Sequence, residues 1–464
     1  MLNAQGEMFM GKNLLLITPW IYDFAAYDLW IKPLGFLYLA SLLRENGYHI
    51  TYIDCLDIFD PLMQEYLSRH TIRLKRKPDG SGQFLKTFVE KPHSLRNIPR
   101  RYGRYGITQE VFNQRLHQAP RPDSVLVTSM MTYWYPGVAR VIELVRGYDT
   151  HIPILLGGNM VTLCPQTASA LGADLCLPGE GERSVLQILQ GITGQPIRYG
   201  PDPDNLDSLP YPAFDLQRKA DFVLLQTSRG CPFRCVYCAS GLLYPKFCRR
   251  SAASVVREIE YSLLRYGTSH FVFYDDALCH EAADYLIPIL RAVEAKRMKV
   301  YFHTPNALHA REITQELAEL FYRTGFRTLR LGFETSNPLR QKLTGGKVTN
   351  EQFQQAVFNL RKAGFSRPQI GVYILTGLPG QSIHEVEESV DFVFQSGAYP
   401  ILTEFSPIPG THLWPYCLEN SPFDLSSDPL LHNNSILPCQ GPELSWEDYL
   451  QLKLKIRARH REIS

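Results

Sequence analysis

The sequence predicts an α/β protein with two units, an N-terminal doubly wound, Rossmann-like domain followed by a partial (β/α)6 barrel of the TIM type. Three observations favour this fold class. Strand and helix patterns alternate along most of the chain, the strand candidates are apolar throughout, and a proline-rich stretch separates two series of such units. Strands without polar alternation are typical of parallel sheets that are buried on both faces. The length of 464 residues also favours two or three domains.

The first series of strands and helices predicts the N-terminal domain over residues 1–192. Apolar strand candidates cover 13–18, 48–54, 124–130, 152–158 and 174–178, and helical periodicity covers 34–47, 136–147 and 165–171. Residues 60–120 do not follow the alternation and are rich in Arg, Lys, Pro and Gly. We therefore predict an insertion there, between the second and third strands.

The predicted insertion is strongly basic. Residues 71–121 contain twelve Lys and Arg but only three acidic residues, a local charge of +9, so the remainder of this +2 chain carries −7. With Tyr102, Tyr105 and Phe112 among its arginines, the insertion is a candidate contact for an acidic substrate, a phosphate or RNA. A solvated surface insertion is the preferred interpretation, and the balanced overall charge does not argue for nucleic acid or membrane.

The second series follows a linker predicted over 193–220, where prolines are frequent. Its strand candidates are 222–227, 270–276, 299–304, 328–334, 369–375 and 401–406, which predicts a barrel over 221–410. Chemistry is expected at the C-terminal ends of these strands. Residues 411–464 form a C-terminal extension, ending in a basic helix that Ser445 caps.

Sequence features argue against secretion and membrane insertion. No apolar stretch approaches the roughly 18 residues that a membrane span needs, and the N-terminus lacks a basic flank and a small-residue cleavage site. Three of the ten cysteines lie within eight residues, a poor layout for disulfides. We expect a cytoplasmic protein that uses these cysteines to bind metal.

The most informative segment is TSRGCPFRCVYCASG, directly after the first barrel strand. It places Cys231, Cys235 and Cys238 in a C-x3-C-x2-C array. Three thiolates on one tight loop suit a [4Fe-4S] cluster in which the fourth iron stays open for a further ligand. The alternative is a closed zinc site or a four-cysteine cluster that includes Cys248.

This loop resembles the signature of the radical S-adenosylmethionine (SAM) superfamily, CxxxCxxC with an aromatic residue before the last cysteine, here Tyr237. The resemblance implies that SAM chelates the open iron and is reductively cleaved to methionine and a 5′-deoxyadenosyl radical. It also implies an electron donor of the flavodoxin or ferredoxin type. The protein would supply binding, orientation and exclusion of water.

The same resemblance implies further SAM-binding residues. One of them is Tyr237, in the cysteine loop itself. The others follow later strands: Asp275 and Asp276 the second, Glu334 the fourth, and Gly377, Leu378 and Pro379 the fifth. The two aspartates can equally cap a strand end, and the glycine loop can be a simple turn. His303 and Asn306 follow the third strand and are candidate substrate contacts, although His303 is as readily a core residue. No residue is assigned a catalytic role.

A doubly wound domain before a radical SAM barrel resembles the cobalamin (B12)-binding subclass of that superfamily. The resemblance implies that cobalamin lies on the C-terminal edge of the first sheet, at Ser129, Gly157 and Gly158. The loop after the first strand lacks the D-x-H-x-x-G histidine that ligates cobalt in classical cobalamin domains. The alternative is a substrate or partner site whose apolar wall would be formed by aromatic residues of that loop: Trp20, Tyr22, Phe24, Tyr27 and Trp30.

The leading hypothesis is a cobalamin-dependent radical SAM methyltransferase that acts on an unactivated carbon of a small molecule or peptide. One alternative is a radical SAM enzyme that catalyses rearrangement or ring formation and whose first domain binds substrate or a partner. Another is a non-catalytic iron-sulfur or zinc module. Thiomethylation of tRNA is disfavoured because no second cysteine trio precedes the barrel.

Overall fold

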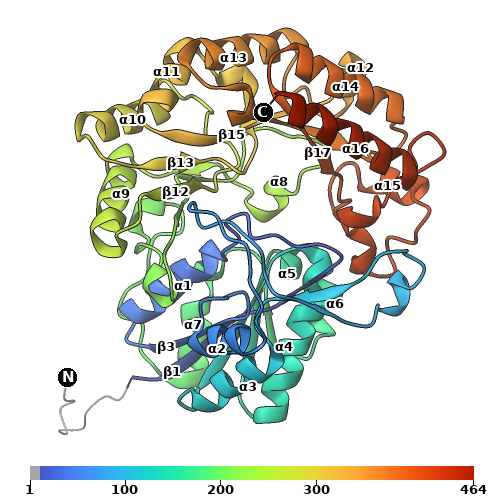
Figure 1. The fold of residues 1–464 in the computed structure, drawn as a ribbon. Coiled ribbons are helices and arrows are strands. Elements are labelled where there is room, and N and C mark those ends of the chain that lie inside the picture. Colours follow the sequence, from blue (N-terminus) through green and yellow to red (C-terminus); the bar gives the residue numbers. More distant parts are fainter. Residues whose placement is uncertain (1–10, 464) are drawn as a thin grey trace, which may run out of the picture. The chain divides into compact units, whose positions relative to one another are not determined.

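The computed structural model describes residues 11–463, and the chain divides into two compact units, Met1–Ala220 and Asp221–Ser464. Residues 1–10, on which the expected absence of a secretion signal partly rests, lie outside the described residues. Figure 1 shows the strands and helices of both units.

The first unit is built on a five-stranded parallel sheet with the strand order β3-β1-β6-β7-β8. This order confirms the doubly wound fold, because the chain adds strands on both sides of β1. The strands are β1 (Asn13–Thr18), β3 (His49–Asp54), β6 (Ser124–Ser129), β7 (Ile154–Gly158) and β8 (Leu175–Leu177). The helices that connect them are α1 (Leu34–Glu45), α2 (Pro61–Arg69), α3 (Gln109–Gln118), α4 (Tyr135–Tyr148), α5 (Asn159–Leu163), α6 (Pro165–Ser169) and α7 (Val185–Thr193).

Alternate residues of β1 explain why its sequence is apolar throughout. Leu14 and Leu16 pack in a core with α1 and α7, whereas Leu15 and Ile17 pack in a second core with α2, α3 and α4. Successive strand side chains point to opposite faces of the sheet, so a sheet covered by helices on both sides needs apolar residues at every position.

The basic insertion is more closely integrated than a surface loop. Its helices α2 and α3 cover one face of the sheet, with Met63 and Phe112 fully buried. Its strands β4 (Lys86–Phe88) and β5 (Gly103–Tyr105) form an antiparallel sheet with β2 (Ile21–Asp23), in the order β2-β5-β4. Residues 61–118 therefore supply the crossover between β3 and β6 and two of the three strands of a small second sheet.

The proline-rich segment 193–220 differs from the extended linker expected there. It belongs to the first unit, where the buried Ala213 joins the core beside α1 and α7. The Asp215 carboxylate also binds Arg44 of α1 at 2.8 Å. The boundary between the two units therefore lies after Ala220.

The second unit contains six parallel strands in the order β9-β12-β13-β15-β16-β17, which confirms the partial barrel. Its strands are β9 (Val223–Leu225), β12 (His270–Phe273), β13 (Tyr301–His303), β15 (Phe326–Glu334), β16 (Ile370–Thr376) and β17 (Tyr399–Glu404), with the short β14 (Leu308–His309) beside β15. Two-residue strands β10 (Ser228–Arg229) and β11 (Cys248–Arg249) pair antiparallel.

Helices cover the outer side of these strands, as Figure 1 shows for α9, α10, α11, α13 and α14. The helices of this unit are α8 (Ser240–Leu243), α9 (Ala252–Tyr266), α10 (Leu286–Ala295), α11 (Gln315–Arg323), α12 (Pro338–Leu343), α13 (Asn350–Ala363), α14 (Ile383–Gln395), α15 (Trp414–Asn420) and α16 (Trp446–Ile463). The α14 helix shows how sequence sets helix ends: Ser382 accepts a hydrogen bond from the Glu385 amide, and Gly397 follows the last turn with φ +86°.

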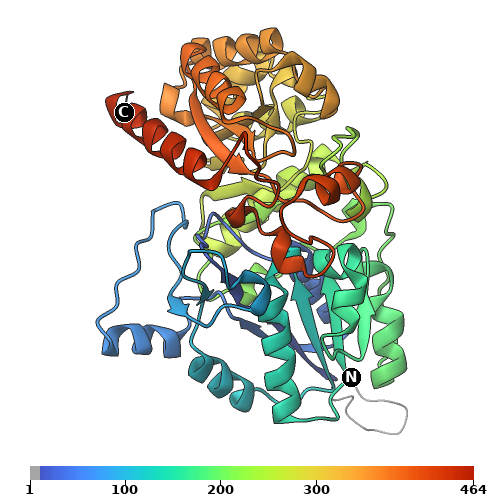
Figure 2. The ribbon, with the colours of Figure 1, turned by 90° about the vertical axis from the view of Figure 1, so that its right-hand side faces the viewer.

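Figure 2 shows the C-terminal helix α16 as the long red helix that leads to the C-terminus. Ser445 caps it, because its hydroxyl accepts from the Asp448 amide at 3.1 Å. Lys455 pairs with Glu387 of α14 at 2.9 Å, and Tyr449 and Ile456 are buried. Among the helices of residues 11–463, each is too short or too polar to cross a membrane.

Candidate functional site

The cysteine loop follows β9 and is closed by the β10–β11 pair, in which Arg229 faces Cys248. Cys231 and Cys235 are partly buried, and Cys238 is exposed. Burial raises the pKa of the Cys231 thiol to about 11 and also raises the pKa of Cys235 and Cys238. The three thiols are therefore protonated at neutral pH until a metal displaces their protons.

Two glycines shape this loop. Gly230 has φ +78°, and a Cβ there would lie 2.6 Å from the Lys246 carbonyl oxygen. Gly345, in the segment after α12, has φ +122°, and a Cβ there would lie 3.0 Å from the Cys235 Cα. Both positions combine a left-handed backbone with a close backbone approach, so only glycine fits without strain.

Two backbone hydrogen bonds attach the middle of the loop to the rest of the barrel. The Val236 amide donates to the Thr344 carbonyl at 3.2 Å, and the Val236 carbonyl accepts from the Leu413 amide at 2.9 Å. The cysteine loop is thereby tied both to the end of α12 and to the C-terminal extension.

The donor set, three thiols on one loop, is chemically suited to an iron-sulfur cluster. Besides burial, the charges of Cys238 and Cys235 raise the pKa of the Cys231 thiol, and the charge of Cys235 raises the pKa of Cys238, so the three lie near one another. In a [4Fe-4S] cluster each thiolate binds a different iron, so the sulfurs surround the cluster and do not meet.

Tyr237 and Glu334 lie together next to the cysteines. The Tyr237 hydroxyl donates a hydrogen bond to Glu334 Oε1, and Lys347 Nζ lies 3.1 Å from the same oxygen. Burial and the Glu334 charge raise the pKa of Tyr237 far above its usual range. The predicted residues Tyr237 and Glu334 thus belong to one buried group, and Lys347 is a member that sequence reasoning missed.

The two neighbouring aspartates have different environments. Asp275 is buried and accepts hydrogen bonds from the Thr227 amide, the Thr227 hydroxyl and the Ser228 hydroxyl. Asp276 instead accepts from the Ser240 hydroxyl, and its charge reaches Cys231 and Cys238. Asp275 therefore anchors the start of the cysteine loop, whereas Asp276 lies beside the cysteines.

His303 and Asn306 already have partners within the barrel. The two ring nitrogens of His303 lie 3.0 Å from His270 Nδ1 and from Thr328 Oγ1, and the side chain is buried. Asn306 donates to the Tyr274 carbonyl at 3.0 Å. The substrate role of both residues stays a prediction, and the exposed Asn306 is the better placed of the two.

The loop after β16 contributes an apolar surface. Gln381 Oε1 accepts from the Gly377 amide at 2.8 Å and the Leu378 amide at 3.2 Å, which holds the turn in place. Leu378 and Pro379 line a cavity of about 400 Å³ together with Val236 of the cysteine loop. This cavity therefore joins the predicted glycine loop to the cysteine loop.

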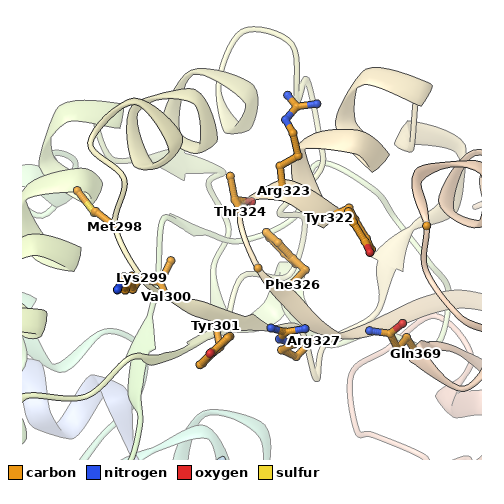
Figure 3. Close-up of a pocket in the computed structure, with 12 residues that line it drawn as sticks. Met298, Lys299, Val300, Tyr301, Tyr322, Arg323, Thr324, Phe326, Arg327 and Gln369 are labelled. Carbon is orange, nitrogen blue, oxygen red and sulfur yellow. The ribbon is translucent and has the colours of Figure 1, made fainter.

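A larger cavity, of about 630 Å³, lies at the opposite end of the barrel (Figure 3). Tyr301 and Phe326, the first residues of β13 and β15, line it. Two basic side chains that line this cavity already contact other residues of the protein. Arg323 binds Glu294 at 2.6 Å, and the Arg327 guanidinium lies over the Tyr301 ring. It is separate from the cysteine loop, which follows the C-terminal end of β9.

In the first unit, Ser129, Gly157 and Gly158 lie together at the C-terminal edge of β6 and β7. The Ser129 hydroxyl donates to the Gly157 carbonyl at 2.8 Å. Gly158 has φ +99°, and a Cβ there would lie 2.1 Å from the Ser129 carbonyl oxygen. A Cβ on Gly157 would meet only one carbonyl oxygen, at 3.8 Å, so the backbone at Gly157 is less crowded than at Gly158.

The proposed aromatic wall is corrected by the structure. Trp20, Phe24 and Trp30 are buried, and the Trp20 indole donates to the Ile107 carbonyl at 2.7 Å. Their rings pack against the basic insertion and are not available to a substrate. Tyr27 alone of the five is exposed.

The three aromatic residues that the sequence offered for contact with RNA are buried, whereas Phe88 of β4 is exposed. Tyr102, Tyr105 and Phe112 have at most 5% of their surface exposed. Several of the basic side chains lie over aromatic rings of the same unit: Arg100 over Phe24, Arg101 over Phe88 and Arg104 over Trp20. The insertion is thus organised around its own contacts.

Two family models match the chain. The radical SAM superfamily model matches residues 225–393, and the B12 binding domain model matches residues 104–189. The first match contains the cysteine loop, Asp275, Asp276, Glu334 and the loop after β16. The second contains β6, β7 and Gly157.

Curated relatives carry methyltransferase names. An uncharacterized methyltransferase of Pyrococcus horikoshii is 26% identical over 329 residues, which cover 65% of this chain and 70% of the relative. An uncharacterized methyltransferase of Synechocystis is 29% identical, over 59% of this chain and 53% of its own. The cytidylyl-2-hydroxyethylphosphonate methyltransferase of Streptomyces wedmorensis is 20% identical, over 83% of this chain and 78% of its own.

Solved structures share the fold. The radical SAM methyltransferase TsrM from Kitasatospora setae, solved with cobalamin and a [4Fe-4S] cluster, has a TM-score of 0.64 at 16% identity, covering 92% of this chain and 85% of that one. The cobalamin-dependent radical SAM enzyme OxsB has a TM-score of 0.58 at 13% identity, covering 98% and 62%. At these identities the likeness establishes the fold.

Proposed function

We infer that this chain, which belongs to the cobalamin-binding subclass of the radical SAM superfamily, is a methyltransferase acting on an unactivated carbon of a small molecule or peptide. Its cofactors are a [4Fe-4S] cluster, SAM and cobalamin. Together they supply radical formation and methyl transfer, the chemistry that protein side chains cannot provide.

The single observation that carries the proposal is the position of the C-x3-C-x2-C loop. It follows the C-terminal end of β9, the end of a parallel barrel at which chemistry takes place, in a chain that also carries a cobalamin-type domain. The methyltransferase names of the curated relatives support methyl transfer as the reaction. An electron donor of the flavodoxin or ferredoxin type would reduce the cluster.

In this proposal the side chains around the loop bind and orient the cofactors. Cys231, Cys235 and Cys238 hold the cluster, and Asp276 accepts a hydrogen bond from the SAM ammonium. Glu334 is the second carboxylate beside the cysteines. Asp275 holds the loop in place through Thr227 and Ser228 and does not itself contact SAM.

The cavity of about 400 Å³ is a candidate site for the apolar part of SAM. Val236, Leu378 and Pro379 line it, so an adenine ring there would lie against both the cysteine loop and the loop after β16. A ligand in this cavity would touch the cysteine loop at Val236.

Cobalamin is proposed to lie on the edge formed by Ser129, Gly157 and Gly158. The five loops that follow the strands of this sheet, residues 19–33, 55–60, 130–134, 159–164 and 178–184, contain no histidine. We therefore propose that cobalt has no histidine ligand from this edge. The electron paramagnetic resonance spectrum of the Co(II) form would then lack nitrogen splitting from a protein imidazole.

The test begins with protein produced anaerobically in cells supplied with cobalamin. We expect about four irons and one cobalt per chain. Incubation with a reductant and SAM is expected to yield 5′-deoxyadenosine, and turnover of a methyl acceptor is also expected to yield S-adenosylhomocysteine. Finding no cobalt would contradict the cobalamin assignment, and finding no SAM cleavage in iron-loaded protein would contradict the enzyme assignment.

Two cysteine variants provide a matched comparison. Cys235→Ala is expected to abolish SAM cleavage and to lose iron, because it removes one of three ligands. Cys248→Ala, at the β11 position beside the same loop, is expected to keep both. Loss of iron in Cys248→Ala would instead indicate a cluster with four cysteine ligands and no open iron.

Rearrangement or ring formation is the second candidate reaction, because the cysteine loop and SAM cleavage would serve it equally well. It predicts 5′-deoxyadenosine without S-adenosylhomocysteine during productive turnover. The ratio of these two products therefore separates the two reactions once a substrate is in hand.

A further inference from the structure

A largely buried lysine, Lys347, lies in the segment between α12 and α13, next to the cysteine loop. Lys347 Nζ is 3.1 Å from Glu334 Oε1, and the two side chains are 13% and 11% exposed. Burial alone would lower the pKa of the Lys347 ammonium, but the charges of Glu334 and Cys235 outweigh burial and raise that pKa above its ordinary value. Lys347 is therefore a fixed positive charge in a place with little water.

The backbone is adapted to this ammonium group. A Cβ on Gly332 of β15 would lie 2.5 Å from Lys347 Nζ, so glycine at this strand position makes room for the charge. Two residues later Glu334 has φ +72°, a left-handed conformation that is costly for a residue with a Cβ. The strand end is thus turned so that the Glu334 carboxylate meets both Lys347 and Tyr237.

The segment that carries Lys347 lies against the cysteine loop. A Cβ on Gly345, two residues before Lys347, would lie 3.0 Å from the Cys235 Cα, and the Thr344 carbonyl accepts from the Val236 amide at 3.2 Å. Tyr237, which lies between Cys235 and Cys238 in the loop, donates its hydroxyl to Glu334 and also approaches the Cys235 sulfur. The ion pair therefore lies next to the part of the loop that carries Cys235 and Cys238.

We infer that Lys347 is a positioning residue that sets the reduction potential of the cluster, with Glu334 and Tyr237 holding its charge next to the part of the loop that carries Cys235 and Cys238. The inference rests on the proposed function, because it requires a cluster on these cysteines. It goes beyond that function by assigning a role to a side chain that binds no iron.

The sign of the effect follows from the charge that the cluster gains on reduction. One-electron reduction takes the [4Fe-4S] core from 2+ to 1+, so the site gains one negative charge while the donor loses one electron. A nearby positive charge stabilises the reduced form, and a nearby negative charge destabilises it. In a protein interior with an effective dielectric constant of about 20, a unit charge within roughly 10 Å changes such an equilibrium by about tenfold.

The experiment is an anaerobic titration of the cluster with titanium(III) citrate at pH 8, followed by electron paramagnetic resonance, in the absence of SAM. Titanium(III) supplies the electron and becomes titanium(IV). Leaving SAM out separates an effect on the cluster from an effect on SAM binding. Each variant is first assayed for iron, so that potentials are compared only between proteins that hold the cluster.

Opposite shifts are expected for the two members of the ion pair. Lys347→Met should lower the ratio of reduced to oxidised cluster at a given potential about tenfold, which is a shift of about 59 mV toward more negative values for a one-electron couple. Glu334→Gln should shift the potential the other way. Lys347→Arg should stay near the wild type, because it keeps the charge.

Two further proteins serve as controls. Lys342→Met removes an exposed lysine of the neighbouring helix α12, whose charge is screened by water, and should leave the potential unchanged. The double variant with Lys347→Met and Glu334→Gln removes both charges and should lie between the single variants. A merely structural role for Lys347 would not produce shifts of opposite sign.

Equal potentials of wild type and Lys347→Met at equal iron content would overturn the inference. If Lys347→Met does not retain iron, Glu334→Gln decides, and an unchanged or lowered potential overturns it. A wild-type protein that binds no cluster would refute the proposed function instead, so the two failures are distinguishable.

Discussion

Substitution of the two adjacent aspartates tests how the cysteine loop is held. The Asp275 side chain, 3% exposed, accepts one backbone and two hydroxyl hydrogen bonds from Thr227 and Ser228, which lead into the loop. Hydrogen bonds to a charged group contribute about 1.5–3 kcal/mol each, and the cost of burying the carboxylate, which raises its pKa, offsets part of the total. We expect Asp275→Ala to lower the free energy of unfolding by about 3 kcal/mol.

Asp276→Asn is the matched comparison. This carboxylate accepts one hydrogen bond from Ser240, and burial raises its pKa, so an amide of the same shape should change stability by less than about 1 kcal/mol. Because Asp276 lies beside Cys231 and Cys238, the same substitution should weaken SAM binding. Asp275→Ala should therefore lower the free energy of unfolding, and Asp276→Asn should lower the affinity for SAM.

The assay is urea denaturation of the metal-free, reduced protein, read by circular dichroism and by hydrogen exchange of peptides that cover residues 223–229. Equilibrium binding of SAM to the iron-loaded proteins gives the second readout. If Asp275→Ala is as stable as the wild type, or if hydrogen exchange of those peptides is unchanged, Asp275 does not anchor the loop. If Asp276→Asn binds SAM as tightly as the wild type, Asp276 does not contact SAM.

Three further substitutions test separate parts of the structure. Gly345→Ala should greatly reduce the iron content, because its Cβ would lie 3.0 Å from the Cys235 Cα at a φ of +122°. Gly346→Ala is the control and should keep the iron, because a Cβ there has no atom within 4 Å. Equal iron contents of the two variants would contradict the close approach. Burial raises the pKa of Asp57 to about 6, so its favourable contribution to stability is present below about pH 4 and lost as pH rises through 6. Asp57→Asn should therefore gain about 2 kcal/mol relative to the wild type between pH 4 and pH 8, as measured by urea denaturation, and a constant difference would refute this. Gly157→Ala should fold normally, because a Cβ there meets only a β8 carbonyl oxygen at 3.8 Å, yet lose cobalt; full cobalt content would place cobalamin elsewhere.

Much of the fold follows from patterns that are local in the sequence. The apolar segments that became β1, β6 and β7, and the barrel strands β12, β15 and β16, were predicted close to their observed bounds. A strand buried on both faces must be apolar at every position, whatever its neighbours are, so its signal is readable without the tertiary structure. The segment 193–220 was less readable, because the packing of Ala213 on α1 depends on a residue pair far apart in the sequence.

The cysteine loop could also be identified from the sequence, because its signal lies within one short segment. Three cysteines within eight residues, with glycine before them and an aromatic residue among them, carry the chemistry of a cluster in a single segment. Tyr237, Glu334 and Asp276 were predicted from strand ends and resemblance, and the structure brings them near the cysteines. Lys347 gave no such signal, since a lysine in a polar loop is ordinary on any protein surface.

The sequence by itself therefore determined the two-unit α/β architecture, the cysteine trio and the strand ends at which we expect the site. Only the tertiary structure decided that Asp275 anchors the loop while Asp276 lies beside the cysteines, and that the aromatic residues after β1 are core. It also joined Tyr237 to Glu334 across 97 residues of sequence. The physical reason is that periodicity and ligand spacing act within one segment, whereas hydrogen-bond partners and burial depend on which segments the fold packs together.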